Sequence, residues 1–130
     1  MKTSIRWVLK ILMVLTFTSG FIYGAAPNHS DHFSNVPSSM LAKANPYSGH
    51  PQAVLAGKKL FDHHCSACHG RGAEGSGRAP SLKGDVIQYT APGAILWFLK
   101  KGDLKHSMPA WSQLPEPTLW QIVTYLKTLP

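Results

Sequence analysis

The sequence has little cysteine and little negative charge. Only two of its 130 residues are cysteines and six are acidic, against 13 lysines and arginines. Two cysteines are too few for a multi-disulfide framework or for a four-cysteine zinc site. No internal repeat is present, and the length is that of one domain. The two cysteines must therefore serve some other purpose, and their spacing indicates which.

Both cysteines lie in the run Cys65-Ser66-Ala67-Cys68-His69, a C-x-x-C-H motif. Two thiols at this spacing can each add to one vinyl group of a haem, and the adjacent histidine then becomes the proximal iron ligand. A zinc site would need two histidines as further ligands, and a thioredoxin-like dithiol would need a βαβ context that the sequence lacks. A disulfide within the motif would close only a tiny loop. We therefore expect one covalent haem c with its iron.

The N-terminal 26 residues resemble a secretory signal peptide. Lys2 and Arg6 precede an apolar stretch, and the small residues Gly24-Ala25-Ala26 suit cleavage. The 16 residues from Ile11 to Ala26 are short for a membrane span of ~20, although an uncleaved anchor is the alternative. We expect an exported, periplasmic protein, tethered to the membrane if residues 1–26 are retained. Their removal would leave a charge of about +4, which does not indicate nucleic-acid binding.

The rest of the chain divides by composition. Residues 27–50 are rich in Ser, Asn, Pro and His without any period, which predicts a flexible polar extension. Residues 51–130 form the expected domain, with apolar periodicity typical of three helices. These helices are predicted at Gln52 to His64, Pro92 to Lys101 and Glu116 to Leu129. The predicted fold is all-α, with three main helices and long loops around one covalently bound haem.

Two glycines have specific predicted roles in these helices. Gly57 within the first helix costs ~1 kcal/mol relative to alanine, which indicates close approach of another helix. We expect the first and third helices to cross at Gly57 and Phe61, with Tyr125 or Ile122 in the crossing. Gly102 is expected to end the second helix as a left-handed cap.

The second axial ligand is predicted by elimination. Met108 is the only methionine in residues 51–130 and lies in the loop between the two later helices. A thioether ligand would raise the reduction potential by stabilising Fe(II). Packing is the alternative role for Met108, and ligation by His69 and His106 is the alternative iron coordination.

An ordered set of motifs resembles the class I monohaem c-type cytochromes of the short bacterial type. The resemblance covers about Val54 to Leu129 and rests on Gly57, Phe61, Cys65-x-x-Cys68-His69-Gly70, Ala79-Pro80-Ser81-Leu82, Gly102, Met108-Pro109-x-Trp111 and Tyr125-Leu126. It implies the small cytochrome c fold and a Pro80 carbonyl that accepts the proton on His69 Nδ1. We also expect Leu82 and Trp97 to contact the haem, with core packing as the alternative for Trp97.

The expected function is one-electron transfer without enzymatic catalysis or a small-molecule substrate. The expected partners are redox proteins, acidic or membrane-bound, and the protein is expected to be a monomer or a subunit of a complex. Six lysines are candidates for steering an acidic partner, with an ordinary solvated surface as the alternative: Lys58, Lys59, Lys83, Lys100, Lys101 and Lys105. A cytochrome subunit of a larger periplasmic dehydrogenase or terminal oxidase complex is the second hypothesis. A haem peroxidase is the third, and Met108 argues against it.

Overall fold

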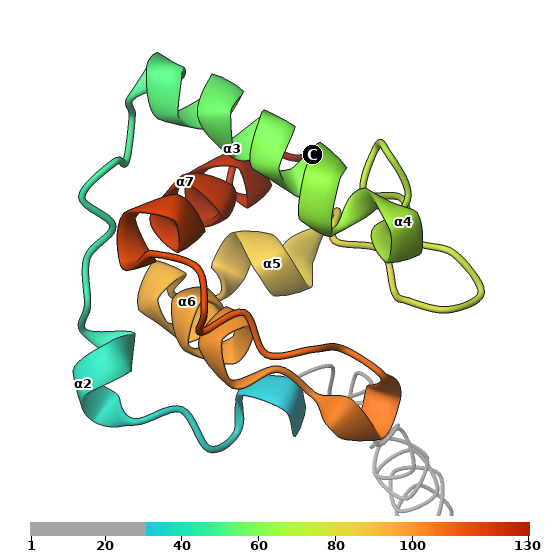
Figure 1. Ribbon diagram of the computed structural model, residues 1–130. Helices are drawn as coiled ribbons and strands as arrows, with labels where there is room; N and C mark the ends of the chain where they lie inside the picture. The colour runs from blue at the N-terminus through green and yellow to red at the C-terminus, as the bar shows by residue number, and fades with distance from the viewer. Residues whose placement is uncertain (1–30) are drawn as a thin grey trace, which may run out of the picture.

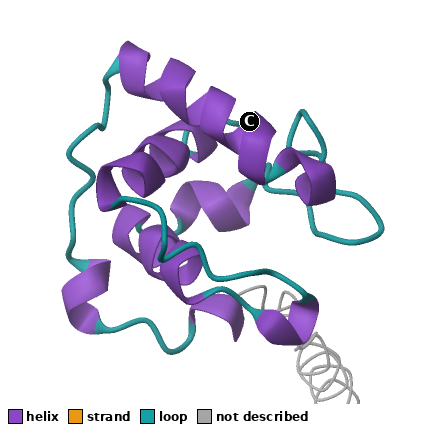
Figure 2. Cartoon of the chain, in the orientation of Figure 1, coloured by secondary structure: helices purple, strands orange, loops and turns teal. Residues whose placement is uncertain are grey.

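The structure, a computed structural model, describes residues 31–130 (Figure 1). The predicted signal peptide at 1–26 lies outside the described residues. Every regular element within 31–130 is helical (Figure 2), in the order η1 Asp31–Phe33, α2 Ser38–Leu41, α3 Pro51–His64, α4 Ser66–His69, α5 Asp85–Tyr89, α6 Pro92–Lys101, η2 Leu104–His106 and α7 Glu116–Leu126. The all-α prediction is confirmed. Across residues 31–130, no helix combines the length and the apolar character needed to cross a membrane.

The three main helices each have a proline in the first turn, where the missing N–H costs no hydrogen bond. Helix α6 has the predicted bounds, and α3 begins one residue earlier than predicted. Helix α7 ends at Leu126 and not at Leu129. The amides of Thr128 and Leu129 bond to carbonyls three residues back, at 2.9 and 3.3 Å, so the chain tightens there and leaves the α-helix.

Helices α3 and α7 cross as predicted, and Figure 1 shows them packed together. A Cβ at Gly57 would overlap the carbonyl oxygen of Gln121 and lie 2.9 Å from Tyr125 Cβ. The rings of Phe61 and Tyr125 lie 5.4 Å apart at a tilt of 54°. The largest fully buried side chains gather around this crossing and on α6: Phe61, Leu96, Leu119, Ile122 and Val123.

The end of α6 differs from the predicted left-handed cap. Gly102 has φ 68° and ψ −174°, so its φ is positive but its ψ is extended. A Cβ there would lie 2.5 Å from the amide nitrogen of Ala110. Glycine is therefore needed both for the backbone conformation and for the close approach of the segment that follows Met108.

Residues 31–50 pack against the helical domain, whereas composition predicted a flexible polar extension over 27–50. The ring of Phe33 lies 5.4 Å from that of Phe98 on α6. A Cβ at Gly93 on α6 would overlap the carbonyl oxygen of Met40. The apolar residues of this segment follow no helical or strand period, which is why composition alone predicted a flexible extension.

Polar contacts hold the same segment to α7. Lys43 Nζ lies 2.5 Å from Glu116 Oε1, and Asn45 donates a 2.9 Å hydrogen bond to Thr124 Oγ1. Thr124 is buried, and its hydroxyl also donates to the Trp120 carbonyl at 2.8 Å, so the hydroxyl is both a donor and an acceptor. The packed unit therefore begins before residue 51, within the part of the chain that the structure describes.

Candidate functional site

The C-x-x-C-H motif forms a tight turn at the end of α3. Cys65 ends that helix with a 2.8 Å hydrogen bond from its amide to the Phe61 carbonyl, and α4 begins at the next residue. The amides of Cys68 and His69 bond to the Cys65 carbonyl at 3.1 and 3.0 Å. Residues three and four positions apart share one face of a helical turn, so the two thiols and the imidazole are neighbours.

The two thiols differ in their surroundings. Cys65 packs against the hydrophobic core, whereas Cys68 is exposed. Burial, and secondarily Cys68, raises the pKa of the Cys65 thiol to about 11. The free Cys65 side chain is therefore a neutral thiol at pH 7, as expected of a sulfur held against an apolar wall.

His69 is fixed in one tautomer by the loop that follows it. Its Nδ1 donates a hydrogen bond to the Pro80 carbonyl oxygen at 2.9 Å, the contact that the resemblance implied. A carbonyl only accepts, so the proton resides on Nδ1 and the lone pair of Nε2 is available to a metal. The hydrogen bond also restricts rotation of the ring.

The loop from residue 70 to residue 84 is folded back onto the motif by its own hydrogen bonds. Gly75 donates its amide proton to the His69 carbonyl at 2.8 Å, and Ser76 Oγ donates to the Cys68 carbonyl at 2.6 Å. The Leu82 amide donates to the Ala73 carbonyl at 2.9 Å. Leu82 is half-buried against the hydrophobic core, which places an apolar side chain just after Pro80.

Met108 lies at the base of a short hairpin. Its amide and carbonyl exchange two 2.9 Å hydrogen bonds with those of Asp103, and η2 with a left-handed Ser107 forms the tip. The Met108 side chain is half-buried and packs against the same core as Cys65 and Leu82. In Figure 1, α4 and the orange hairpin lie on the same side of the molecule.

The sequence of the helical domain matches a known protein-family model. The match covers residues 52–126, more than half of the chain, and the model is described as Cytochrome C oxidase, cbb3-type, subunit III. The chain belongs to this family. No solved structure matches the chain.

Membership in the cbb3-type subunit III family confirms the predicted c-type cytochrome and its small all-α fold. The protein is a haem electron-transfer protein whose cofactor is covalent haem c with its iron. The residues present fit that cofactor. Cys65 and Cys68 share one turn, His69 has a free Nε2 beside them, and Leu82 and Met108 supply apolar surface.

The contact that the structure shows for Trp97 is with a lysine side chain. It is half-buried on α6, and the Lys101 ammonium lies over its ring, 4.7 Å from the centroid. A cation over an aromatic face is a stabilising surface pair. Contact between Trp97 and the haem stays a prediction.

Several residues that shape the site gave little signal in the sequence. Hydrogen bonds from Gly75 and Ser76 fold the loop back onto the C-x-x-C-H turn, and no regular pattern in the sequence indicated them. The ring centres of Trp111 and His64 are 5.2 Å apart. This contact packs the segment that follows Met108 against the end of α3. His32 lies close to Asp103 and His106 although it belongs to the predicted flexible extension, and no local pattern indicates this contact.

Proposed function

We propose that this protein is an exported, periplasmic one-electron carrier in which His69 and Met108 are the axial ligands of the haem iron. Cys65 and Cys68 hold the haem by thioether bonds, and no substrate is turned over. The observation that carries the proposal is the 2.9 Å hydrogen bond from His69 Nδ1 to Pro80, which leaves Nε2 free within the C-x-x-C-H turn.

The residues of the chain have distinct tasks in this function. When bound, the haem supplies reversible exchange of one electron between Fe(II) and Fe(III). Pro80 fixes the imidazole tautomer and makes His69 a more basic ligand. The paired backbone of the Asp103–Met108 hairpin keeps the Met108 thioether in place, and a thioether favours Fe(II) and therefore a high potential.

The test compares Met108→Ala with His106→Ala in the exported holoprotein. The oxidised native protein should show the weak long-wavelength charge-transfer band of a thioether–iron bond, and its pigment should resist extraction by acidified acetone. Met108→Ala should lose the band and bind added CO rapidly when reduced, whereas His106→Ala should keep the native spectrum. Loss of low-spin ligation in His106→Ala alone would instead assign the ligand to His106.

A second function is supported by the family itself, whose printed description is that of an oxidase subunit. In this case the same haem passes electrons within a permanent complex, and residues 1–26 or the 31–50 segment provide attachment. Co-purification with a larger membrane protein from the native host distinguishes this role. An isolated monomer after mild extraction favours the mobile carrier.

A further inference from the structure

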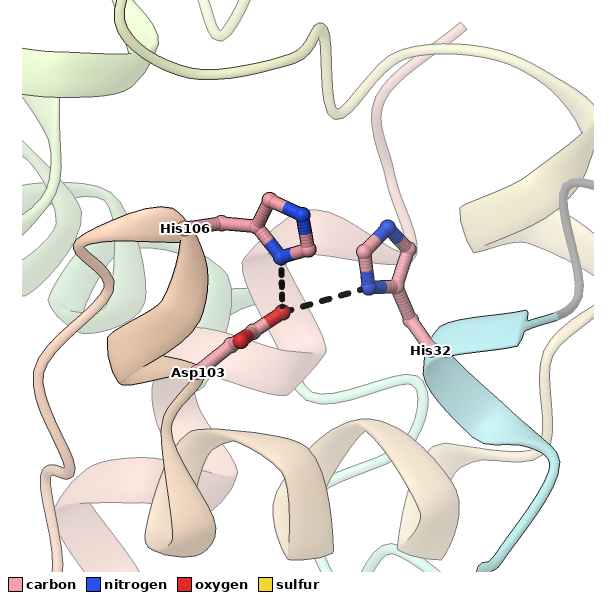
Figure 3. Close-up of side chains that lie close together, drawn as sticks. All are labelled: His32, Asp103 and His106. Carbon is pink, nitrogen blue, oxygen red and sulfur yellow. Dashed lines mark hydrogen bonds and ion pairs between the residues drawn. The ribbon is translucent and has the colours of Figure 1, made fainter.

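Two histidines and one aspartate meet on the surface beside the Met108 hairpin. His32 comes from η1 and His106 from η2, and Asp103 directly precedes η2 (Figure 3). Asp103 Oδ2 is 2.7 Å from His106 Nδ1 and 3.4 Å from His32 Nδ1. One ligand atom from each residue lies within 4.8 Å of the others. The three donors therefore converge on one point, although about 70 residues separate His32 from Asp103 and His106.

The packing around the cluster holds these donors in position. The His32 ring makes edge contacts with Phe98 and His106, with ring centres 5.8 and 5.5 Å away. Asp103 is held by the two backbone hydrogen bonds of the hairpin. A donor set whose backbone and rings are already restricted loses less entropy when it binds a ligand.

The cluster also has access to solvent. It lines a surface hollow of about 680 Å³ together with Phe98 and Lys101. Lys101 and Lys105 both line the hollow and oppose the entry of a cation, and the carboxylate of Asp103 offsets part of their charge. The Lys101 ammonium lies over the Trp97 ring, 4.7 Å from the ring centre. An ion can therefore enter with water molecules that complete its coordination.

We propose that His32, Asp103 and His106 form a binding site for one divalent transition-metal ion of the zinc class. Two imidazoles and one carboxylate, with a fourth position open to water, are an established zinc ligand set. Magnesium and calcium prefer oxygen ligands alone, so this mixed set excludes them as the natural occupants. The site rests on the proposed ligation of the haem iron by His69 and Met108, because His106 cannot bind the iron and the second metal ion at once.

The distances agree with the size of such an ion. Zinc lies about 2.0–2.1 Å from nitrogen and 2.0–2.2 Å from oxygen, so tetrahedral ligand atoms are roughly 3.3 Å apart. The separation of 3.4 Å between His32 and Asp103 already has this value. The 2.7 Å pair between His106 and Asp103 must open by roughly 0.6 Å, which exposed His106 can do by rotating its side chain.

The test is a calorimetric titration of the chelator-treated holoprotein with Zn²⁺ alone. We expect one ion per chain, with affinity at least about tenfold lower in His32→Phe and in His106→Ala. His32→Phe keeps an aromatic ring against Phe98 and removes only the ligand nitrogens, so its haem spectrum should stay native. His50→Ala and His63→Ala are matched controls, because both histidines are exposed and lie outside the cluster.

X-ray absorption at the zinc edge then identifies the ligand atoms. The site predicts nitrogen and oxygen neighbours at about 2.0–2.1 Å and no sulfur shell at ~2.3 Å. Failure to bind Zn²⁺, equal binding in His32→Phe and His106→Ala, or a sulfur shell would each overturn the proposal.

Discussion

At the scale of single residues, Gly75 decides where the Pro80 carbonyl lies. Its φ is +86°, and a Cβ there would be 2.5 Å from Ser81 N and 2.8 Å from Pro80 C. Gly75→Ala should displace that peptide from His69 and lower the free energy of unfolding. Because the left-handed backbone alone costs an L-residue about 1–2 kcal/mol, the total loss should reach at least that amount. Denaturant unfolding of the holoprotein measures it.

Gly77→Ala is the control for this loop, since a Cβ at Gly77 meets nothing within 4 Å. We expect its unfolding free energy to stay within about 0.5 kcal/mol of the native value. The Nδ1 proton of His69 should remain protected from exchange in Gly77→Ala and exchange faster in Gly75→Ala. Identical behaviour of the two variants would mean that Gly75 does not position Pro80.

The spatial proximity of residues was easiest to predict where they belong to one short motif. Cys65, Cys68 and His69 lie within five positions, so their proximity follows from one helical turn. The geometry of His69 with Pro80 needed the family resemblance, because the loop between them follows no regular period. His32 could not be placed from local pattern, since its partners Asp103 and His106 lie about 70 residues further along the chain.

At the scale of elements, the crossing of α3 and α7 depends on the missing side chain at Gly57. In Gly57→Ala, the higher helix propensity of alanine should raise the free energy of unfolding by ~1 kcal/mol. Overlap of the new Cβ with the Gln121 carbonyl should lower it by more. Overpacking typically costs about 1–3 kcal/mol, and a backbone neighbour cannot turn away as a side chain can. We expect a net loss of about 2 kcal/mol, measured by thermal and denaturant unfolding.

Lys59→Ala tests whether this loss is specific to the crossing. Lys59 is exposed on the same helix, so its substitution should change stability by no more than about 0.5 kcal/mol. If Gly57→Ala were as stable as Lys59→Ala, the two helices would have to pack further apart than the structure places them.

Among the elements, periodicity predicted the long helices and missed the short ones. Helix α6 matched its predicted bounds because a proline, an apolar face and a glycine define it locally. Helix α5 and the 3₁₀ turns contain too few residues to show a period. The packing of α2 on α6 depends on a close backbone contact at Gly93, which an isolated glycine in the sequence does not specify.

At the scale of the whole molecule, Glu116 joins three parts of the chain. Hydrogen bonds from Lys43, and next from Lys100, lower the pKa of its carboxyl from 4.5 to about 2. On acidification, the Glu116 carboxylate is therefore protonated at a higher pH in the unfolded chain than in the folded one. Its stabilisation of the fold is complete above pH 4.5 and is lost as the pH falls toward 2. Solvent reaches the carboxylate, with 36% of the side chain exposed, which limits the effect to about 1 kcal/mol.

Glu116→Gln should remove this part of the acid sensitivity while keeping the size of the side chain. Unfolding free energies measured across that pH range should fall less steeply in Glu116→Gln than in the native protein. Lys43→Gln should flatten the same slope, and the double variant should add little to either change. An unchanged slope in Glu116→Gln would show that other groups account for the acid sensitivity.

The surface charge of the whole molecule determines how it meets an acidic redox partner. Of the six candidate lysines, Lys58 is paired with Asp62 at 2.7 Å and Lys100 with Glu116 at 3.1 Å. Lys101 is held over the Trp97 ring, which leaves exposed Lys59, Lys83 and Lys105 as the steering candidates. Replacing these three by glutamine should slow association with an acidic partner at low salt. Raising the ionic strength from about 0.01 to 0.1 M should remove the difference, as the screening length falls from ~30 to ~10 Å.

Stopped-flow reduction of the partner measures this rate. Lys58→Gln is the control and should have the smaller effect, since its ammonium is already neutralised by Asp62. Rates that do not depend on salt in the native protein would assign the lysines to an ordinary solvated surface.

The packing of residues 31–33 against Phe98 and His106 fixes the point of departure of the preceding chain. Residue 31 therefore lies on the rim that also carries the Met108 hairpin. In the proposed carrier, a redox protein that docks beside Met108 would contact η1 as well as the helical domain.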